Sequence, residues 1–292
     1  MINLLKTSLR RLVARVIWPI LLEERRGLRF NPYVSGKLFP LQADNYYYIV
    51  SNSHRGVTEP LPVPPKDLWV GYADTEEEYL SGGQRHVFAM LDILQKAGAR
   101  PESLYRVLEL GCAGARMLRH YPYVPEQSEL WGVDISAKHI TWCQQHLSPP
   151  FVFATITTSP HLPFEDNYFD LIFCGSVFTH ISDLADAWFL ELRRVLRKGG
   201  YAYITIHDKH SLELLFTKYR DISAEFVAKI HQFDQQTSAL TKDYACFSFF
   251  SDPSSQVFYD TKHLVGKWSQ FAKLLSVTPE AYEYQTALLF KK

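Results

Sequence analysis

The chain has 292 residues, enough for one large α/β domain with an extension or for two small domains. Hydrophobic residues make up 47% of the chain and aromatic residues 14%, so a sizeable buried core can form. Lys and Arg number 31, as do Asp and Glu, which gives a formal net charge of zero. Because a general nucleic-acid binder needs a cationic surface, this balance argues against that class of protein.

The four cysteines form no CxxC pair, and the His and Asp residues show no ligand spacing, so we expect neither a disulfide framework nor a metal site. No apolar run approaches the ~20 residues that span a bilayer. Arg10, Arg11 and Arg15 interrupt the stretch where the apolar core of a signal peptide would lie. The expected location is the cytoplasm.

Residues 2–18 have the apolar spacing of an amphipathic helix, with basic residues mostly on the opposite side. Such a helix is suited to a peripheral contact with an anionic membrane or with a partner. The alternative is a helix that packs its apolar face on the main domain or on a second subunit, and we favour it because most amphipathic helices of globular proteins are half-buried.

The segment 27–75 is rich in proline and predicts an irregular arm. A helix is expected over 75–97, with acidic residues in its first turn and with Gly82 and Gly83 as a kink or a break. We take residues 1–99 as an N-terminal helical and irregular extension, and residues 100–292 as the main domain.

From residue 100 onward strands alternate with helices, which predicts an α/β fold with a doubly wound, mostly parallel sheet. Five strands are expected at 106–110, 129–133, 151–156, 169–174 and 201–206, with helical stretches at 114–121, 137–147 and 183–197. Ser182 is the expected cap of the last helix, and Gly199 and Gly200 its end. Residues 211–240 look helical, within an insertion at about 209–253. Two final strands, 257–259 and 284–290 around a helix at 261–275, bring the total to seven.

Two strand ends carry the features of a nucleotide-type site. Residues 107–116 run from a buried strand into a glycine-rich turn, which brings backbone N–H groups close to a ligand. Asp134 ends the second strand, 23 residues after Gly111, where a carboxylate can accept hydrogen bonds from both hydroxyls of an adenosine ribose.

Glu109 separates two classes of ligand. A dinucleotide places its pyrophosphate over the turn, where this carboxylate would repel it, whereas a ligand with an amino group and a sulfonium favours a negative charge. The alternative role for Glu109 is a strand-end carboxylate paired with Arg116 or Arg106.

Four segments in this order resemble those of the class I S-adenosylmethionine-dependent methyltransferases. Residues 109–116 (Glu-Leu-Gly-Cys-Ala-Gly-Ala-Arg) are similar to the first motif of that family, and Asp134 to the acid that closes its second strand. Residues 162–172 resemble the turn into the fourth strand, and residues 192–200 the signature before the fifth. The likeness covers about residues 100–210, and residues 284–290 look like the family's final antiparallel strand. The resemblance implies S-adenosyl-L-methionine as cofactor.

The chain departs from the family pattern at two places. Ala113 and Ala115 stand where glycine is usual, and alanine is penalised at positive φ. The acid that often follows the third strand is replaced by the hydroxyl residues 157–159.

By resemblance, the residues expected to contact the cofactor are Glu109, Gly111, Cys112, Ala113, Gly114, Arg116, Asp134, Ile135, Thr158, Cys174, Gly175 and Ser176. His180 follows the fourth strand and is the first candidate for a general base, with a structural histidine as the equal alternative. His207 and Asp208, at the end of the fifth strand, are further catalytic candidates, although a mutual bond between them is slightly favoured.

These observations predict a methyltransferase that acts on a small-molecule, sugar or lipid acceptor, with oxygen slightly preferred because His180 could remove a hydroxyl proton. A catalytically inactive cofactor-binding or scaffold protein of the same fold is the alternative, suggested by the two alanines of the turn. An NAD-dependent oxidoreductase is disfavoured by Glu109 and by the lack of a catalytic partner set.

Overall fold

The computed structural model describes residues 60–122, 127–221, 223–238, 240, 243–249 and 255–292. The expected N-terminal helix at 2–18 and most of the proline-rich arm lie outside these residues. Within the described part, η2 (Lys66–Leu68) forms the ordered turn of the arm. The long helix α3 (Glu76–Lys96) follows it, and the Thr75 side chain and Glu78 close a reciprocal cap at its first turn.

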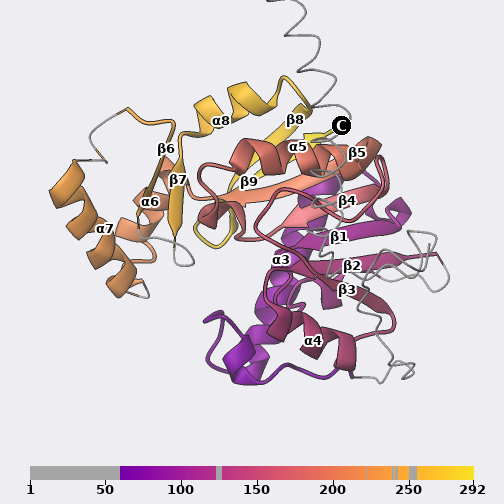
Figure 1. Ribbon diagram of the computed structural model, residues 1–292. Helices are drawn as coiled ribbons and strands as arrows, with labels where there is room; N and C mark the ends of the chain where they lie inside the picture. The colour runs from indigo at the N-terminus through magenta and orange to yellow at the C-terminus, as the bar shows by residue number, and fades with distance from the viewer. Residues whose placement is uncertain (1–59, 123–126, 222, 239, 241–242, 250–254) are drawn as a thin grey trace, which may run out of the picture. The chain divides into compact units, whose positions relative to one another are not determined.

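A seven-stranded sheet forms the centre of the fold (Figure 1). Its strand order is β3 (Phe151–Thr155), β2 (Glu129–Asp134), β1 (Arg106–Leu110), β4 (Phe169–Cys174), β5 (Leu196–Ile206), β9 (Gln285–Lys291) and β8 (Lys273–Tyr282). The first five strands pair in parallel, and β9 runs antiparallel to both of its neighbours. The prediction of a mostly parallel seven-stranded sheet with an antiparallel final strand is confirmed. The strand expected at 257–259 does not belong to this sheet, however, because it pairs with residues 246–249, and β8 takes the seventh place.

Five further α-helices and a small second sheet follow in the described part of the chain. Helices α4 (Ala137–His146), α5 (Ala185–Val195) and α8 (Thr261–Trp268) accompany the main sheet. After β5 come α6 (Lys209–Phe216) and α7 (Ala224–Thr237), and then the antiparallel pair β6 (Cys246–Phe249) and β7 (Gln256–Tyr259). Figure 1 shows α6, α7, β6 and β7 grouped at one side of the main sheet.

The helix expected at 114–121 is not formed, so that prediction was wrong. Residues 111–117 are turns and bends, followed only by the single 3-10 turn η4 (Leu118–His120). Ala113 and Ala115 have φ of +43° and +58°, which lies outside the α-helical region. Two left-handed residues within three positions prevent the start of a helix there.

Three other helix predictions need correction. Helix α5 begins at Ala185 with Leu184 in the cap position, so Ser182 does not cap it, and the chain passes at Leu196 directly into β5. The expected helix over 211–240 is two helices, α6 and α7. The helix expected over 261–275 ends at Trp268, and β8 was missed altogether because its residues alternate only weakly between buried and exposed.

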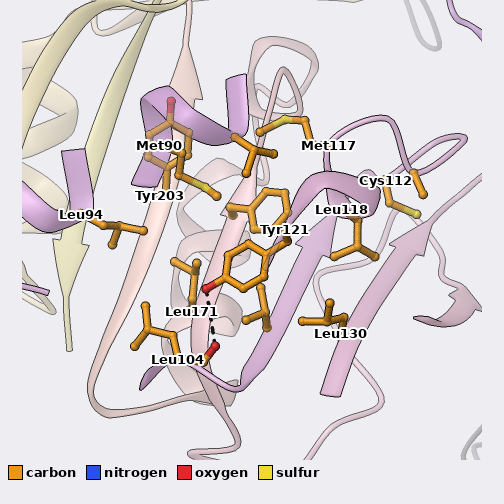
Figure 2. Close-up of a cluster of buried hydrophobic side chains, with 14 of the residues drawn as sticks. Met90, Leu94, Leu104, Cys112, Met117, Leu118, Tyr121, Leu130, Leu171 and Tyr203 are labelled. Atoms are coloured by element: carbon orange, nitrogen blue, oxygen red, sulfur yellow. Dashed lines mark hydrogen bonds between the residues drawn. The ribbon is translucent and has the colours of Figure 1, made fainter. Parts of the chain in front are cut away.

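Helix α3 and the turn after β1 share one core with the sheet (Figure 2). Met90 and Leu94 of α3 are fully buried in this core. The hydroxyl of Tyr121 donates to the carbonyl oxygen of Leu104 at 3.5 Å, which ties the end of the turn to the start of β1. The core also contains Met117, Leu118, Leu130, Leu171 and Tyr203. The place of a helix after β1 is therefore taken by compact turns packed on α3.

Gly82 and Gly83 lie in the middle of α3, and the helix runs through them without the expected break. A Cβ atom on Gly83 would lie 2.1 Å from the carbonyl oxygen of Arg116, whereas one on Gly82 would lie 3.2 Å from the side-chain Nη1 of the same residue. Gly83 therefore serves the close approach of α3 to the turn after β1.

Gly83→Ala is expected to lower the free energy of unfolding by about 2–3 kcal/mol, because a rigid backbone oxygen must move. Gly82→Ala is the matched control in the same helix. Its free energy of unfolding is expected to stay within about 0.5 kcal/mol of the wild-type value. The better helix propensity of alanine offsets the cost of a small movement of the Arg116 side chain. Urea denaturation measures both. Equal effects of the two substitutions would contradict this account of the helix packing.

Candidate active site

The predicted site residues gather at the carboxyl ends of four neighbouring strands, β2, β1, β4 and β5. The order of connection reverses between β1 and β4, and ligands of doubly wound sheets bind at such a point. Gly111 ends β1 with a φ of +73°. A Cβ atom there would lie 2.3 Å from Cγ2 of Val177, so glycine is required where the turn meets the loop after β4.

Asp134 holds the turn after β1 in place. Its Oδ2 accepts a hydrogen bond from the backbone N–H of Ala113 at 2.8 Å, and its Oδ1 accepts one from that of Ser136 at 2.7 Å. The carboxylate is only half-buried, and each oxygen keeps a further lone pair for a ligand. The next residue, Ile135, is 56% exposed and presents apolar surface beside this carboxylate. A hydroxyl-bearing ring attached to a flat base matches this pair of features.

Glu109 lies buried beneath the turn. Its Oε2 accepts a hydrogen bond from the backbone N–H of Leu118 at 3.0 Å. Burial raises the pKa of this carboxyl to about 8, although the Leu118 N–H and Arg116 act in the opposite direction. Among the ion pairs of the described residues none joins Glu109 to Arg106 or Arg116, so the alternative of a strand-end salt bridge is not observed. A cationic group next to Glu109 would favour its ionised form.

Arg116 points away from the turn into a buried aromatic cluster. Its Nη2 bonds Nδ1 of His86 at 2.9 Å and donates to the hydroxyl of Tyr282 at 2.5 Å. Its guanidinium lies 4.2 Å from the ring centroid of Tyr72. Burial and the neighbouring Arg116 lower the pKa of His86 to about 3, so that ring is neutral near pH 7. Tyr282 carried no signal in the sequence, since it comes from β8, a strand that was not predicted.

The loop after β4 is held by a polar network from β5 and β9. Thr205 Oγ1 accepts from the Ser176 backbone N–H at 2.7 Å and donates to Oε1 of Gln285 at 2.7 Å. The Gln285 amide donates to the Ser176 hydroxyl at 2.9 Å. Ser176 itself has a φ of +58°, an unfavourable value for a residue with a side chain. Sequence reasoning identified Gly175 and Ser176 but missed Thr205 and Gln285, whose role depends on sheet pairing.

His180 lies in the 3-10 turn η5 (Phe178–His180) beyond this loop, and it is exposed. Its Nδ1 is 2.7 Å from the backbone carbonyl oxygen of Ser255. The side-chain amide nitrogen of Gln256 lies farther from Nδ1, at 3.4 Å. Because a carbonyl only accepts hydrogen bonds, the shorter contact assigns the proton to Nδ1, and Nε2, which has no recorded partner among the described residues, is then the basic nitrogen. This is the tautomer that a general base at Nε2 requires.

His207 and Asp208 do not bond each other, contrary to the mutual bond that was slightly favoured. Asp208 caps α6, where its Oδ1 accepts from the Ser211 backbone N–H at 2.9 Å, and its Oδ2 accepts from the Thr261 hydroxyl at 3.0 Å. The carboxylate is buried and has a structural role in these contacts. His207 is buried too, and neither of its ring nitrogens has a hydrogen-bond partner among the described residues.

Four other predicted cofactor residues occupy less direct positions. Cys112 and Cys174 are fully buried, so each offers only its backbone to a ligand. A Cβ atom on Gly114 would meet the Tyr79 hydroxyl at 2.9 Å and Pro64 Cγ at 3.0 Å, so this glycine serves packing against the arm and α3. Thr158 is exposed, and its carbonyl oxygen accepts from Nε1 of Trp188 at 3.3 Å.

The residues that the structure describes contain no group of three or more His, Cys, Asp or Glu side chains placed to hold a metal ion. None of the helices in the same residues is both long and apolar enough to cross a membrane.

Comparison with known proteins agrees with this geometry. Residues 108–204 match the family model described as "Methyltransferase domain". A ubiquinone/menaquinone biosynthesis C-methyltransferase of Cupriavidus pinatubonensis is 28% identical over 139 residues, which are 47% of this chain and 56% of the relative. An uncharacterized protein of Methanocaldococcus jannaschii is 37% identical over 62 residues, 20% of this chain and 27% of that protein. The chain thus spans about half or less of the length of these curated relatives.

A solved structure, that of the PH0226 protein from Pyrococcus horikoshii, has a similar fold. It superimposes with a TM-score of 0.50 at 16% identity and covers 78% of this chain and 99% of that one. This likeness shows the fold. Together with the match to the family model, it identifies residues 108–204 as a methyltransferase domain of the class I type, whose cofactor is S-adenosylmethionine.

The residues present fit that cofactor. Asp134 and Ile135 offer a carboxylate and an apolar surface for the adenosine, and the buried Glu109 favours a cationic group near the turn. Gly111 and Gly175 come directly after β1 and β4, and neither places a side chain where the two loops meet. A Cβ atom on Gly175 would lie 2.9 Å from the Tyr282 ring.

Proposed function

We propose that the whole chain is an active S-adenosylmethionine-dependent methyltransferase that methylates an oxygen of a small-molecule, sugar or lipid acceptor. The observation that carries the proposal is His180, which stands at the exposed end of the β4 loop with Nε2 free and Nδ1 held by Ser255. The cofactor residues Glu109 and Asp134 lie at the ends of the adjacent strands β1 and β2.

The residues of the chain would divide the work as follows. Asp134, Ile135 and Glu109 hold the cofactor, which when bound supplies a methyl group already activated on a sulfonium. The network of Thr205 and Gln285 fixes the loop that carries Ser176 and leads to His180. His180 Nε2 takes the proton of the acceptor hydroxyl and passes it to solvent, to which this side chain is open. The rest of the rate acceleration over the uncatalysed reaction comes from alignment of the methyl donor with the acceptor oxygen.

We assign the acceptor walls to the described residues of α6, α7 and β7. The curated relative is named a C-methyltransferase, so carbon is the second candidate for the methylated atom. A carbon acceptor that is already nucleophilic would depend less on His180 than a hydroxyl does.

The test is transfer of labelled methyl from S-adenosylmethionine to a panel of phenols, alcohols, sugars and hydroxylated lipids. His180→Gln is expected to lower the rate on the best acceptor by about 10²–10⁴-fold, with affinity for S-adenosylhomocysteine unchanged. His146→Gln, at an exposed histidine of α4, is the matched control and should leave the rate unchanged.

An unchanged rate for His180→Gln would refute the general-base role. If the wild-type protein binds S-adenosylhomocysteine but labels no member of the panel, the catalytically inactive scaffold becomes the better description of the chain.

A further inference from the structure

Among the described residues, His207 is the side chain near the site with two buried polar atoms that lack hydrogen-bond partners. It follows directly after β5, it is 2% exposed, and both of its ring nitrogens lack hydrogen-bond partners among the described residues. A neutral imidazole has one N–H donor and one acceptor nitrogen, so two polar atoms are buried unused. Each such atom costs about 1–3 kcal/mol. Packing alone gives no reason to keep a histidine there, because a phenylalanine would fill the same space.

The surroundings of His207 are aromatic and come from three elements. Its ring centroid lies 4.8 Å from that of Phe258 in β7, 5.4 Å from that of Tyr284 between β8 and β9, and 6.2 Å from that of Phe226 in α7. Burial, and to a smaller extent His180, lowers its pKa to about 3, so the ring is uncharged near pH 7. The adjacent carboxylate of Asp208 is engaged by Ser211 and Thr261. This environment favours a flat, uncharged ligand.

The position of His207 joins it to the proposed reaction site. Two residues earlier, Thr205 bonds the backbone of Ser176 in the loop after β4. On the other side, His207 bridges to Phe258 of β7, and the residue just before that strand, Ser255, holds His180. The described wall residues of α6, α7 and β7 form a hydrophobic cluster separate from the main core.

We propose that His207 anchors the acceptor, and that the acceptor is an uncharged hydroxylated aromatic ring. One hydroxyl of the acceptor bonds an imidazole nitrogen of His207, while the rings of Phe226, Phe258 and Tyr284 pack on its faces. The inference rests on the proposed methyl transfer and narrows its acceptor from small molecules in general to phenols.

The experiment compares phenol with toluene, which has the same ring but no hydroxyl, by ligand-observed NMR titration of the full chain saturated with S-adenosylhomocysteine. Wild-type protein is expected to bind phenol about 5–10-fold more tightly than toluene, as one hydrogen bond predicts. His207→Phe should bind both alike and should also melt at a higher temperature, because two unsatisfied polar atoms are removed. His207→Gln, which keeps a donor and an acceptor, should retain a preference for phenol.

His231→Phe is the matched control, since this exposed histidine of α7 stacks on Phe216 in the same insertion. It should keep the wild-type preference for phenol. The proposal is overturned if wild-type protein binds phenol and toluene equally, or if His207→Phe lowers the melting temperature, as loss of a structural polar contact would. Failure of the methyltransferase proposal appears separately, as absence of labelled methyl transfer to every acceptor of the panel even where phenol binds with the expected preference.

Discussion

Asp134→Ala is expected to weaken binding of S-adenosylhomocysteine by at least about 100-fold. The carboxylate stands where it can accept hydrogen bonds from two ribose hydroxyls, and each bond to a charged group is worth about 1.5–3 kcal/mol. It also holds the Ala113 backbone N–H at 2.8 Å, so its loss frees the turn that faces the ligand. Isothermal titration calorimetry of the purified chain measures the dissociation constant directly.

Asp134→Asn is the matched control, because it keeps the shape of the side chain and one acceptor oxygen. We expect this variant to bind S-adenosylhomocysteine about 10-fold more weakly than the wild-type protein does, and more tightly than Asp134→Ala does. A melting curve of each variant separates loss of binding from loss of fold. Wild-type affinity in Asp134→Ala would contradict the assignment of the ribose site. No binding by folded wild-type protein would instead point to the left-handed alanines of the turn and to the inactive scaffold.

Glu109→Gln is expected to raise the free energy of unfolding at pH 8 by on the order of 3 kcal/mol. At pH 4.5 the same substitution should leave the free energy of unfolding nearly unchanged. Burial raises the pKa of this carboxyl from 4.5 to about 8 in the folded chain. Between those two values the unfolded chain loses the proton that the folded chain keeps. Wild-type stability therefore falls as the pH rises through this window. The amide of the variant does not titrate, and its oxygen can still accept from the Leu118 N–H.

Chemical denaturation at pH 4.5 and pH 8, without ligand, measures this difference. Glu165→Gln, in an exposed turn, serves as control and should leave the change in stability between the two pH values as in wild type. The groups that act on Glu109 are the Leu118 N–H, Arg116 and Asp134, and all three are kept in both variants. If Glu109→Gln is less stable than wild-type protein at pH 8, the carboxylate is ionised in the fold and a cationic partner must hold it.

The parts of this fold that depend on local sequence could be predicted. The bounds of β1 and β4 match the expected strands, because each is a short apolar run closed by turn residues. Helix α3 begins where its acidic first turn indicated. The parallel pairing of the first five strands followed from their alternation with helices, and parallel strands bring Gly111, Asp134 and Ser176 to the same edge of the sheet.

The rest depended on contacts between residues far apart in the chain. A helix was expected after β1, but left-handed φ values at Ala113 and Ala115 and close packing on Gly83 replace it with turns. Tyr282 and Gln285 reach the site from β8 and β9, which pair beyond β5. His207 was expected to bond Asp208, and only the packed structure shows an aromatic environment without a polar partner.

The place of β9 in the sheet has a consequence for how the chain is made. Residues 285–291 lie between β5 and β8, yet a ribosome translates them after every other strand. Until they emerge, β5 has an open edge, and Thr205 and Ser176 lack the amide of Gln285. Such an edge invites pairing with other chains. The nascent chain therefore exposes the edge of β5 until residues 285–291 emerge, and the polar network behind the loop after β4 is complete only when the sheet has closed.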